Sequence, residues 1–374
     1  MVIRPLHIAA LLAAALLAAC AVPSAPRSPS GSHPIGVAGP MSGPYAVFGD
    51  PMEFGARLAI EDINAAGGVL GKPRVLEVGV DRCDPRRAVS VANSMAGRGI
   101  VLMAGHFCSG SSIPASLVYG EEGIVQISPA STNPALTDEG GAHVFRVSGR
   151  DDSQGVLAGR YIAANHGGQR IAIDHDGTAY GKGLADVARE TLRAANVNEQ
   201  VYRGIRAGQS DYPEVVAELE SESIDVLYYG GYHTEAGLLI SRLRKRGMDT
   251  LLIGADALVT DEFWDIAGPA GDGTLMSFGP DPRDFPAASA VVASARARGE
   301  EPDGYVLYTY AAIQAWAQAA ERAGTTGHDA VIDVLRGGTF DTVLGKLGFD
   351  GKGDVTRIDT YVWYIWRNGT YGML

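Results

Sequence analysis

The sequence predicts an α/β protein with parallel, doubly wound sheets, and two observations support this fold class. From residue 34 onward, short apolar runs typical of buried strands alternate with runs of helical period. Such alternation produces a parallel sheet with helices on both of its faces. The alternation occurs as two arrays in tandem, with breaks near Gly149-Arg150 and near Gly279-Pro280. We therefore expect two lobes, a cleft between them and a hinge.

The first array begins with an expected strand over 34–39 and a Gly/Pro-rich loop over 40–49. Asp50-Pro51-Met52-Glu53 then opens a helix, because Asp is a good N-cap, Pro suits the first helical position and Glu completes a capping box. Gly67-Gly68 ends that helix. The next expected elements are a strand over 75–80, a helix over 86–98 and a strand over 100–104.

The second array repeats this order beyond residue 150. Its expected elements are strands over 170–173, 224–229 and 250–253, and helices over 181–195 and 234–246. Gly247 stops the second of these helices. A helix over 305–323 follows, and an alternating run over 358–366 predicts a hairpin-like finish.

The N-terminus has the features of a targeting segment. Its apolar run over 8–19 is too short to span a bilayer and ends in Leu17-Ala18-Ala19-Cys20, which resembles a bacterial lipobox. In such signals the Cys is lipidated and becomes the first mature residue, so we assign 1–20 to the signal and lipidation to Cys20. A plain secretory peptide is the alternative, and it also exports the protein. Residues 21–33, rich in Pro and Ser, form a flexible tether.

Charge and cysteine content restrict the possible partners and the compartment. A formal net charge of −12 argues against nucleic acid and anionic membrane surfaces as partners. Export places Cys83 and Cys108 in an oxidising compartment, where an isolated pair most simply forms one disulfide. Two free buried thiols are the alternative.

Two successive strand-to-helix junctions lie within residues 105–134, and each carries small hydroxyl residues where a strand ends. In an open α/β sheet such junctions lie side by side at the carboxyl ends of the strands. Unpaired N–H groups and helix N-termini there favour an anion such as a carboxylate. We therefore expect this stretch to form half of a binding site for a small zwitterion.

Several short motifs occur along nearly the whole mature chain: Ala38-Gly-Pro-Met-Ser-Gly-Pro44, Gly49-Asp50, Asp62-Ile-Asn-Ala-Ala-Gly-Gly68, Cys83-Asp84-Pro85, Gly105-His106, Ile127-Ser-Pro129, Thr132-Asn-Pro134 and Tyr228-Tyr-Gly-Gly-Tyr232. Together these motifs resemble those of a known family, the Leu/Ile/Val-binding proteins, which are extracytoplasmic receptors of branched-chain amino-acid ABC transporters.

The resemblance implies the type I periplasmic-binding fold, in which two doubly wound parallel-sheet lobes are joined by three hinge crossovers and close on a ligand in the cleft. It also implies that Cys83 and Cys108 form the family's disulfide. We expect the N-terminal lobe to comprise 34–150 plus 280–358, and the C-terminal lobe 151–279 plus 359–374.

The resemblance also implies a set of ligand contacts. Ser109 and the backbone of Thr132 match groups that hold the amino-acid carboxylate. The carbonyl of Ala130 and the hydroxyl of Thr132 match groups that accept hydrogen bonds from the ammonium. Tyr180 and Tyr232 match aromatic residues of the second lobe that close over the ligand.

Three further positions bear on the choice of ligand. Phe48 falls where the family has an aromatic wall, and Phe107 where it often has Leu. Asp256 falls where many members carry a Glu that pairs with the ammonium, and it is one methylene shorter. We therefore expect tighter lobe closure, a bridging water, or a ligand other than a plain branched-chain amino acid.

Each assignment has a simpler alternative. Ser109 is otherwise a helix N-cap, Asp256 caps a short turn, and the two tyrosines belong to the core. His106 is expected to be a hydrogen-bonded structural residue. His175 and His233 lie beside predicted cleft residues, where they either contact the ligand or belong to solvated loops.

The sequence offers little support for an enzyme, because no nucleophile elbow, HExxH or Walker motif occurs and the His residues lack metal-ligand spacing. We predict a monomeric, lipid-anchored, non-enzymatic receptor without cofactor or metal, in the periplasm or at the cell surface. It would capture a branched-chain or other small amino acid and deliver it to an ABC permease. The alternatives are a receptor of the same fold for another amino acid, an amide or an aromatic acid, and an extracellular sensor subunit.

Overall fold

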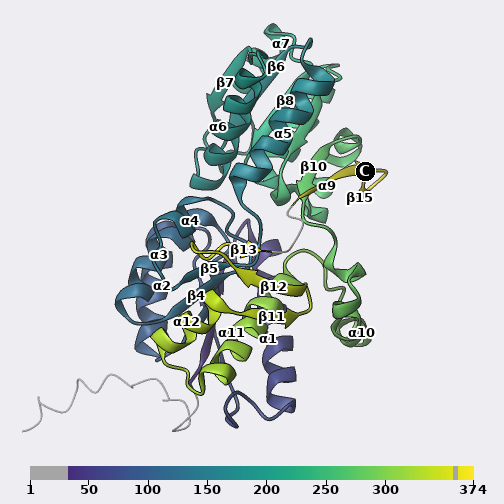
Figure 1. The fold of residues 1–374 in the computed structure, drawn as a ribbon. Coiled ribbons are helices and arrows are strands. Elements are labelled where there is room, and N and C mark those ends of the chain that lie inside the picture. Colours follow the sequence, from purple (N-terminus) through teal and green to yellow (C-terminus); the bar gives the residue numbers. More distant parts are fainter. Residues whose placement is uncertain (1–32, 357–360) are drawn as a thin grey trace, which may run out of the picture.

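The computed structural model describes residues 33–356 and 361–374, which form two lobes joined by crossing segments of chain (Figure 1). The lipobox and tether assigned above lie outside the described residues. Among the described residues, no helix combines the length and the apolar content needed to cross a bilayer.

The first lobe is built on a five-stranded parallel sheet of order β2-β1-β3-β4-β5. Its strands are β1 (Ile35–Gly39), β2 (Leu76–Val80), β3 (Leu102–Gly105), β4 (Val125–Ser128) and β5 (Val144–Arg146). Its helices are α1 (Ala46–Ala65), α2 (Pro85–Gly97), α3 (Ser109–Glu121), α4 (Ala135–Asp138), α10 (Ser289–Ala297), α11 (Val306–Ala323) and α12 (His328–Gly337).

Alternate residues of the inner strands point to opposite faces of this sheet. Val37 and Ala104 belong to the apolar cluster that contains α1 and α11 residues. Ala38 and Met103 belong to the cluster formed with α2 and α3. Both faces are therefore covered by helices, which confirms the predicted doubly wound arrangement.

The second lobe contains a seven-stranded sheet of order β15-β14-β10-β9-β8-β6-β7. Its strands are β6 (Ile171–His175), β7 (Val201–Gly204), β8 (Val226–Gly230), β9 (Leu251–Gly254), β10 (Leu275–Phe278), β14 (Val362–Arg367) and β15 (Thr370–Met373). Its helices are α5 (Asp151–His166), α6 (Ala179–Ala194), α7 (Pro213–Ser221), α8 (His233–Lys245) and α9 (Asp261–Ala267).

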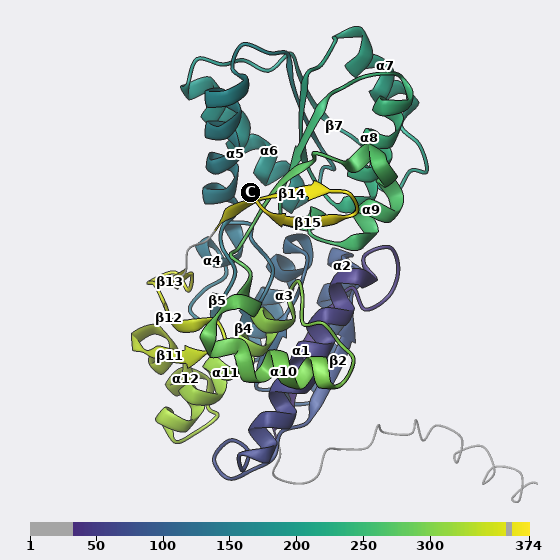
Figure 2. The same cartoon turned by 90° about the vertical axis from the view of Figure 1, so that its right-hand side faces the viewer.

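The second sheet is parallel from β7 through β10, as predicted, and an antiparallel hairpin extends it. β14 pairs antiparallel with β10 and with β15, in a hairpin near the end of the lobe that faces the first lobe (Figure 2). Asn368 and Gly369 turn this hairpin with φ of 50° and 90°, values that an Asn-Gly turn accommodates readily. Strands joined by so short a turn must run antiparallel. The predicted hairpin-like finish is thereby confirmed, although its start over 358–360 lies outside the described residues.

Short elements complete the fold. They are the 3₁₀ turns η1 (Asp256–Leu258), η2 (Gly268–Gly271), η3 (Pro282–Asp284) and η4 (Pro286–Ala288), and a small antiparallel sheet of β11 (Thr339–Thr342), β12 (Gly345–Phe349) and β13 (Val355–Thr356).

The first helix begins earlier than predicted. α1 starts at Ala46, so Pro51 lies inside it and Asp50 does not cap it. The earlier start buries the Phe48 ring against Phe107, with ring centroids 4.6 Å apart. Burying an aromatic ring is worth roughly 2–3 kcal/mol, which outweighs the roughly 1 kcal/mol of an N-cap. Tertiary packing therefore overrides the local capping signal.

The chain crosses between the two sheets after β5 and after β10. The third expected crossover falls at 357–360, outside the described residues. The exact lobe boundaries given above remain a prediction.

Candidate functional site

Seven of the eight predicted ligand-binding residues line one small cavity between the lobes, with a volume of about 10 Å³. We call it the inner cavity; its lining residues are Phe107, Ser109, Ala130, Thr132, Tyr180, Tyr232, Asp256 and Ala257. They follow the carboxyl ends of strands in both sheets, where ligands bind in open α/β folds. The eighth residue, Phe48, lies directly behind Phe107 and stacks on it with an interplanar angle of 11°.

Ser109 presents its hydroxyl at the start of α3. It is the first helical residue, and the N-cap position belongs to Cys108, so the alternative of a Ser109 N-cap is wrong. The Ser109 Oγ accepts a hydrogen bond of 3.2 Å from the backbone N–H of Asn133. Because that contact uses a lone pair, the hydroxyl proton remains available to an acceptor such as a carboxylate.

The loop that carries Thr132 is held by a buried guanidinium. Arg146 donates to the carbonyls of Ser131 and Asn133 at 3.0 and 2.9 Å. Arg146 also pairs with Asp354, with 2.6 Å between Nε and Oδ1. The hydroxyl of Thr132 is buried and interacts only with the Asp151 carboxyl among the described residues. A buried hydroxyl in this state is a ready partner for a polar ligand.

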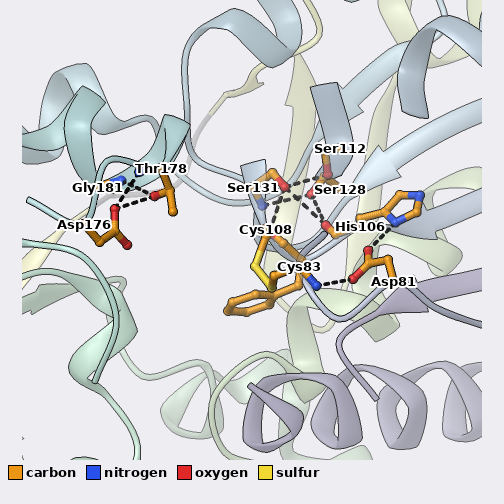
Figure 3. The surroundings of a disulfide bond; sticks show 11 residues. Asp81, Cys83, His106, Cys108, Ser112, Ser128, Ser131, Asp176, Thr178 and Gly181 are labelled. Carbon is orange, nitrogen blue, oxygen red and sulfur yellow. Dashed lines mark hydrogen bonds and ion pairs between the residues drawn. A yellow bond between two sulfur atoms is a disulfide. The ribbon is translucent and has the colours of Figure 1, made fainter. Parts of the chain in front are cut away.

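The predicted disulfide joins Cys83 to Cys108 (Figure 3). Beside it, His106 is fully buried, with its Nδ1 2.5 Å from Asp81 and its Nε2 2.9 Å from the Tyr119 hydroxyl. The prediction that His106 is a structural residue is confirmed. Asp81 also accepts from the Cys83 N–H at 2.8 Å, so the disulfide and the histidine brace one junction.

Asp256 places a buried carboxyl group on the second-lobe side of the cavity. Its Oδ1 accepts from the Tyr180 hydroxyl at 2.8 Å and its Oδ2 from the Tyr305 hydroxyl at 2.5 Å. Its side chain caps no turn, although Asp256 begins η1, so the capping alternative is wrong. Burial raises the pKa of Asp256 above its ordinary value, because the charged form loses its hydration. A ligand cation would restore the balance in favour of the carboxylate.

Two functional candidates were missed by sequence reasoning. Tyr305 reaches the site from the residue before α11, and it meets Phe107 edge-on with ring centroids 5.0 Å apart. Asp151, the first residue of α5, is fully buried, and its carboxyl interacts with the Thr132 hydroxyl without a well-formed ion pair among the described residues. Burial, followed by the charge of Asp256, raises the pKa of Asp151 well above its ordinary value. No local motif marks either residue.

Aromatic rings form the remaining sides of the inner cavity. Tyr232 lies 4.7 Å from Tyr45 of the first lobe and 5.2 Å from Tyr180, measured between ring centroids. Tyr45 and Tyr232 also line a larger outer cavity of about 450 Å³, which extends past the disulfide to the start of α6. Figure 3 shows this start of α6 opposite the disulfide. The inner cavity is thus walled off by side chains of both lobes.

His175 and His233 do not line the inner cavity, and neither belongs to a solvated loop. His175 ends β6 and lies against the Tyr202 ring, 5.4 Å between centroids. His233 begins α8, where its Nε2 is 2.9 Å from Glu262 and its ring meets Phe48 edge-on. Within the described residues, no group of three or more His, Cys, Asp or Glu side chains is suited to a metal ion.

Comparison with known proteins agrees with this architecture. A family model described as periplasmic binding protein matches residues 32–369. A Leu/Ile/Val-binding protein homologue of Brucella suis is 43% identical over 339 residues, which cover 90% of this chain and 91% of that protein.

Solved structures show the same fold. A leucine binding protein from Thermotoga maritima superposes with a TM-score of 0.82 at 24% identity and covers 91% of this chain and 97% of its own. An ABC transporter substrate-binding protein from Desulfitobacterium hafniense, solved in complex with Leu, gives a TM-score of 0.74 at 27% identity, with 92% of this chain and 100% of its own covered.

Proposed function

The chain belongs to the periplasmic binding protein family, in the group that includes the Leu/Ile/Val-binding proteins, and we propose that it is the amino-acid receptor of an ABC importer. The single observation that carries this proposal is the inner cavity, whose walls come from both lobes and offer complementary groups for a zwitterion. Capture would follow from closure of the lobes around the ligand.

A buried zwitterion requires a partner for each of its charges, because an unpaired buried charge costs several kcal/mol. For the carboxylate, the cavity offers the Ser109 hydroxyl and the N-terminus of α3. For the ammonium, it offers Asp256, the carbonyl of Ala130 and the hydroxyl of Thr132. We assign these roles to the four residues.

The cavity favours a ligand with a small side chain. Phe107 occupies space at the first-lobe wall, and its ring is fixed by Phe48 on one side and by Tyr305 on the other. Asp256 is one methylene shorter than the Glu found in many family members. The hydroxyls of Tyr180 and Tyr305 both donate hydrogen bonds to its carboxylate. We therefore propose alanine-sized to valine-sized amino acids as ligands, with leucine and isoleucine at the upper limit.

The cellular setting follows from the family and from the N-terminal sequence. A receptor of this class acts outside the cytoplasm, and the lipobox-like Leu17-Ala18-Ala19-Cys20 would tether a monomer to the membrane near its permease. Growth of the bacterium on radioactive glycerol or palmitate, followed by isolation of the protein, tests the anchor. Label should appear in the wild type and be lost in Cys20→Ser.

A thermal-shift screen of the purified, ligand-stripped protein against all amino acids, simple amides and benzoate tests the function. Small aliphatic amino acids should raise the melting temperature, since a ligand that binds only the folded state stabilises it by mass action. D-enantiomers serve as matched controls with the same composition. Stabilisation by benzoate or amides alone would instead favour the receptor for another ligand class, and no stabilisation by any compound would contradict the proposal.

A further inference from the structure

One side chain connects the ligand-binding loop of the first lobe to the closing edge of the second. Asn133 follows Thr132, and three of its four polar groups are used within the first lobe. Its N–H donates to the Ser109 hydroxyl, its carbonyl accepts from Arg146, and its Oδ1 accepts from the Ala135 N–H at 2.9 Å. The fourth group, Nδ2, donates across the cleft to the Ala179 carbonyl at 2.7 Å.

The second lobe has a matching feature at the same place. Gly183 lies one turn along α6 from Ala179, and its backbone has no left-handed torsion that would require glycine. A Cβ built on Gly183 would lie 2.8 Å from the Asn133 Nδ2, closer than real contacts allow. Glycine inside a helix lowers its stability, so a compensating reason is expected. The space occupied by the Asn133 amide supplies that reason.

The N-terminal end of α6, which carries the accepting Ala179 carbonyl, is held by its own hydrogen bonds. Thr178 caps it by accepting from the Gly181 N–H at 3.0 Å, and Asp176 accepts from the Thr178 N–H at 2.8 Å (Figure 3). Gly181 allows close approach to β8, because an added Cβ would lie 2.3 Å from the Gly230 carbonyl oxygen. The Ala179 carbonyl is therefore held in place before the lobes meet.

From these contacts we propose that Asn133 and Ala179 form an interlobe latch, a hydrogen bond that holds the closed state without touching the ligand and for which Gly183 leaves room. The latch rests on the proposed function, since closure serves ligand capture. Asn133 acts as a positioning residue: its backbone orients the Ser109 hydroxyl, and its side chain fixes the adjoining edge of the second lobe. Because the latch forms on closure, its loss should mainly accelerate ligand release.

Two variants test the latch from opposite sides. Asn133→Ser retains a short acceptor for the Ala135 N–H but cannot reach Ala179. Gly183→Ala leaves Asn133 intact and displaces its amide, while improving the helix propensity of α6. Gly97→Ala is the control, since it changes a helical glycine in α2 where an added Cβ meets nothing within 4 Å.

Affinity and dissociation rate are measured with L-alanine and L-valine. We expect both variants to weaken both ligands by the same factor, about two- to fivefold, mostly through faster dissociation. The ligand-free melting temperature should not fall in Gly183→Ala. The double variant should be no weaker than the worse single variant, because both changes remove one bond.

Small-angle X-ray scattering of the ligand-free proteins supplies a readout that needs no ligand. Either the uniform loss of affinity or a shift of the variants toward the open form supports the latch. Variants that match the wild type in both affinity and scattering overturn it, and so does an affinity loss that differs between the two ligands. If the wild type binds no amino acid, the proposed function fails and the scattering comparison alone decides the latch.

Discussion

The first-lobe wall of the inner cavity is built mainly from backbone and short hydroxyl side chains, whereas the second-lobe wall is built from long side chains. Ser109 and Thr132 lie on junctions that are braced by the disulfide, by His106 and by Arg146. Tyr180 and Asp256 instead reach into the cavity from the ends of strands of the second sheet. The difference suggests a division of labour. The first-lobe wall would hold the carboxylate and help to hold the ammonium, and the second-lobe wall would add the charge partner that sets the affinity.

Removal of the second-lobe charge should produce the largest effect. Asp256→Asn keeps the shape of the side chain but deprives a buried ammonium of its charge partner, which costs about 3–5 kcal/mol. We expect ligand affinity to fall by at least a hundredfold in isothermal titration calorimetry, with Asp265→Asn, an exposed residue of α9, as the control. Affinity within threefold of the wild type would remove Asp256 from the site.

The pH dependence of binding provides a second readout of the same residue. Binding of an ammonium requires the ionised form of Asp256, and burial has raised the pKa of this carboxyl in the free site. Protonation therefore competes with the ligand as the pH falls, and it begins at a higher pH than for an ordinary carboxyl. Wild-type affinity should decline toward acid pH, whereas the affinity of Asp256→Asn should lack this dependence.

The bracing of the first-lobe wall is tested by removing its disulfide. Cys83→Ser combined with Cys108→Ser should lower the free energy of unfolding by about 3 kcal/mol, the chain-entropy value for a loop of this size. Calorimetric melting measures the loss, and reduction of the wild type should reproduce it. If the division of labour holds, the ranking of ligands stays the same. A changed ranking would show that this wall also selects among amino acids.

Asp151 lies where the two walls meet, because its N–H donates to the Thr132 carbonyl. Its carboxyl should lower the free energy of unfolding at neutral pH. Its pKa is raised on folding, so stability is highest when it is protonated and declines as pH rises through its unfolded value. Asp151→Asn should therefore raise the stability of the ligand-free protein at neutral pH, on the order of 1 kcal/mol, and change little at acid pH. Melting scans across pH check this sign, and a destabilised variant at neutral pH would contradict it.

Phe107 offers the test with the smallest expected effect, because it is a first-lobe residue that lines the inner cavity and is proposed to limit the size of the ligand side chain. Phe107→Leu should improve leucine binding relative to alanine by roughly fivefold, about 1 kcal/mol for a changed apolar contact. Competition titrations of the two ligands measure the ratio. An unchanged ratio would assign selectivity wholly to the second lobe.

Much of this architecture was accessible from the sequence because its signals are local. Apolar period, Gly stops and the tandem arrangement predicted six strands and four helices to within two residues, whereas others, such as β7, α5 and α7, were given no bounds. The signal for the hairpin-like finish was also local, and Asn368-Gly369 forms its turn. The start of α1 could not be predicted from the local sequence. It depends on the burial of Phe48 against Phe107, a residue of the junction that follows β3.

The candidate site divides in the same way. Its hydroxyl junctions could be found because parallel strands bring their carboxyl ends together, and the family resemblance added the second-lobe residues. Tyr305 and Asp151 were not predicted as site residues, because their roles depend on partners far away in the chain. Tyr305 meets Asp256 across 49 positions, and the latch joins Asn133 to Ala179 across 46.

The sequence by itself determined the fold class, the strand ends that carry the ligand groups and the class of molecule they suit. These properties follow from periodicity and from residue chemistry within short windows. Only the tertiary structure decided which aromatic rings narrow the cavity, which hydroxyls serve Asp256 and how Asn133 spans the cleft. Those features depend on distances between two lobes, and such distances are fixed by packing rather than by any local stretch of chain.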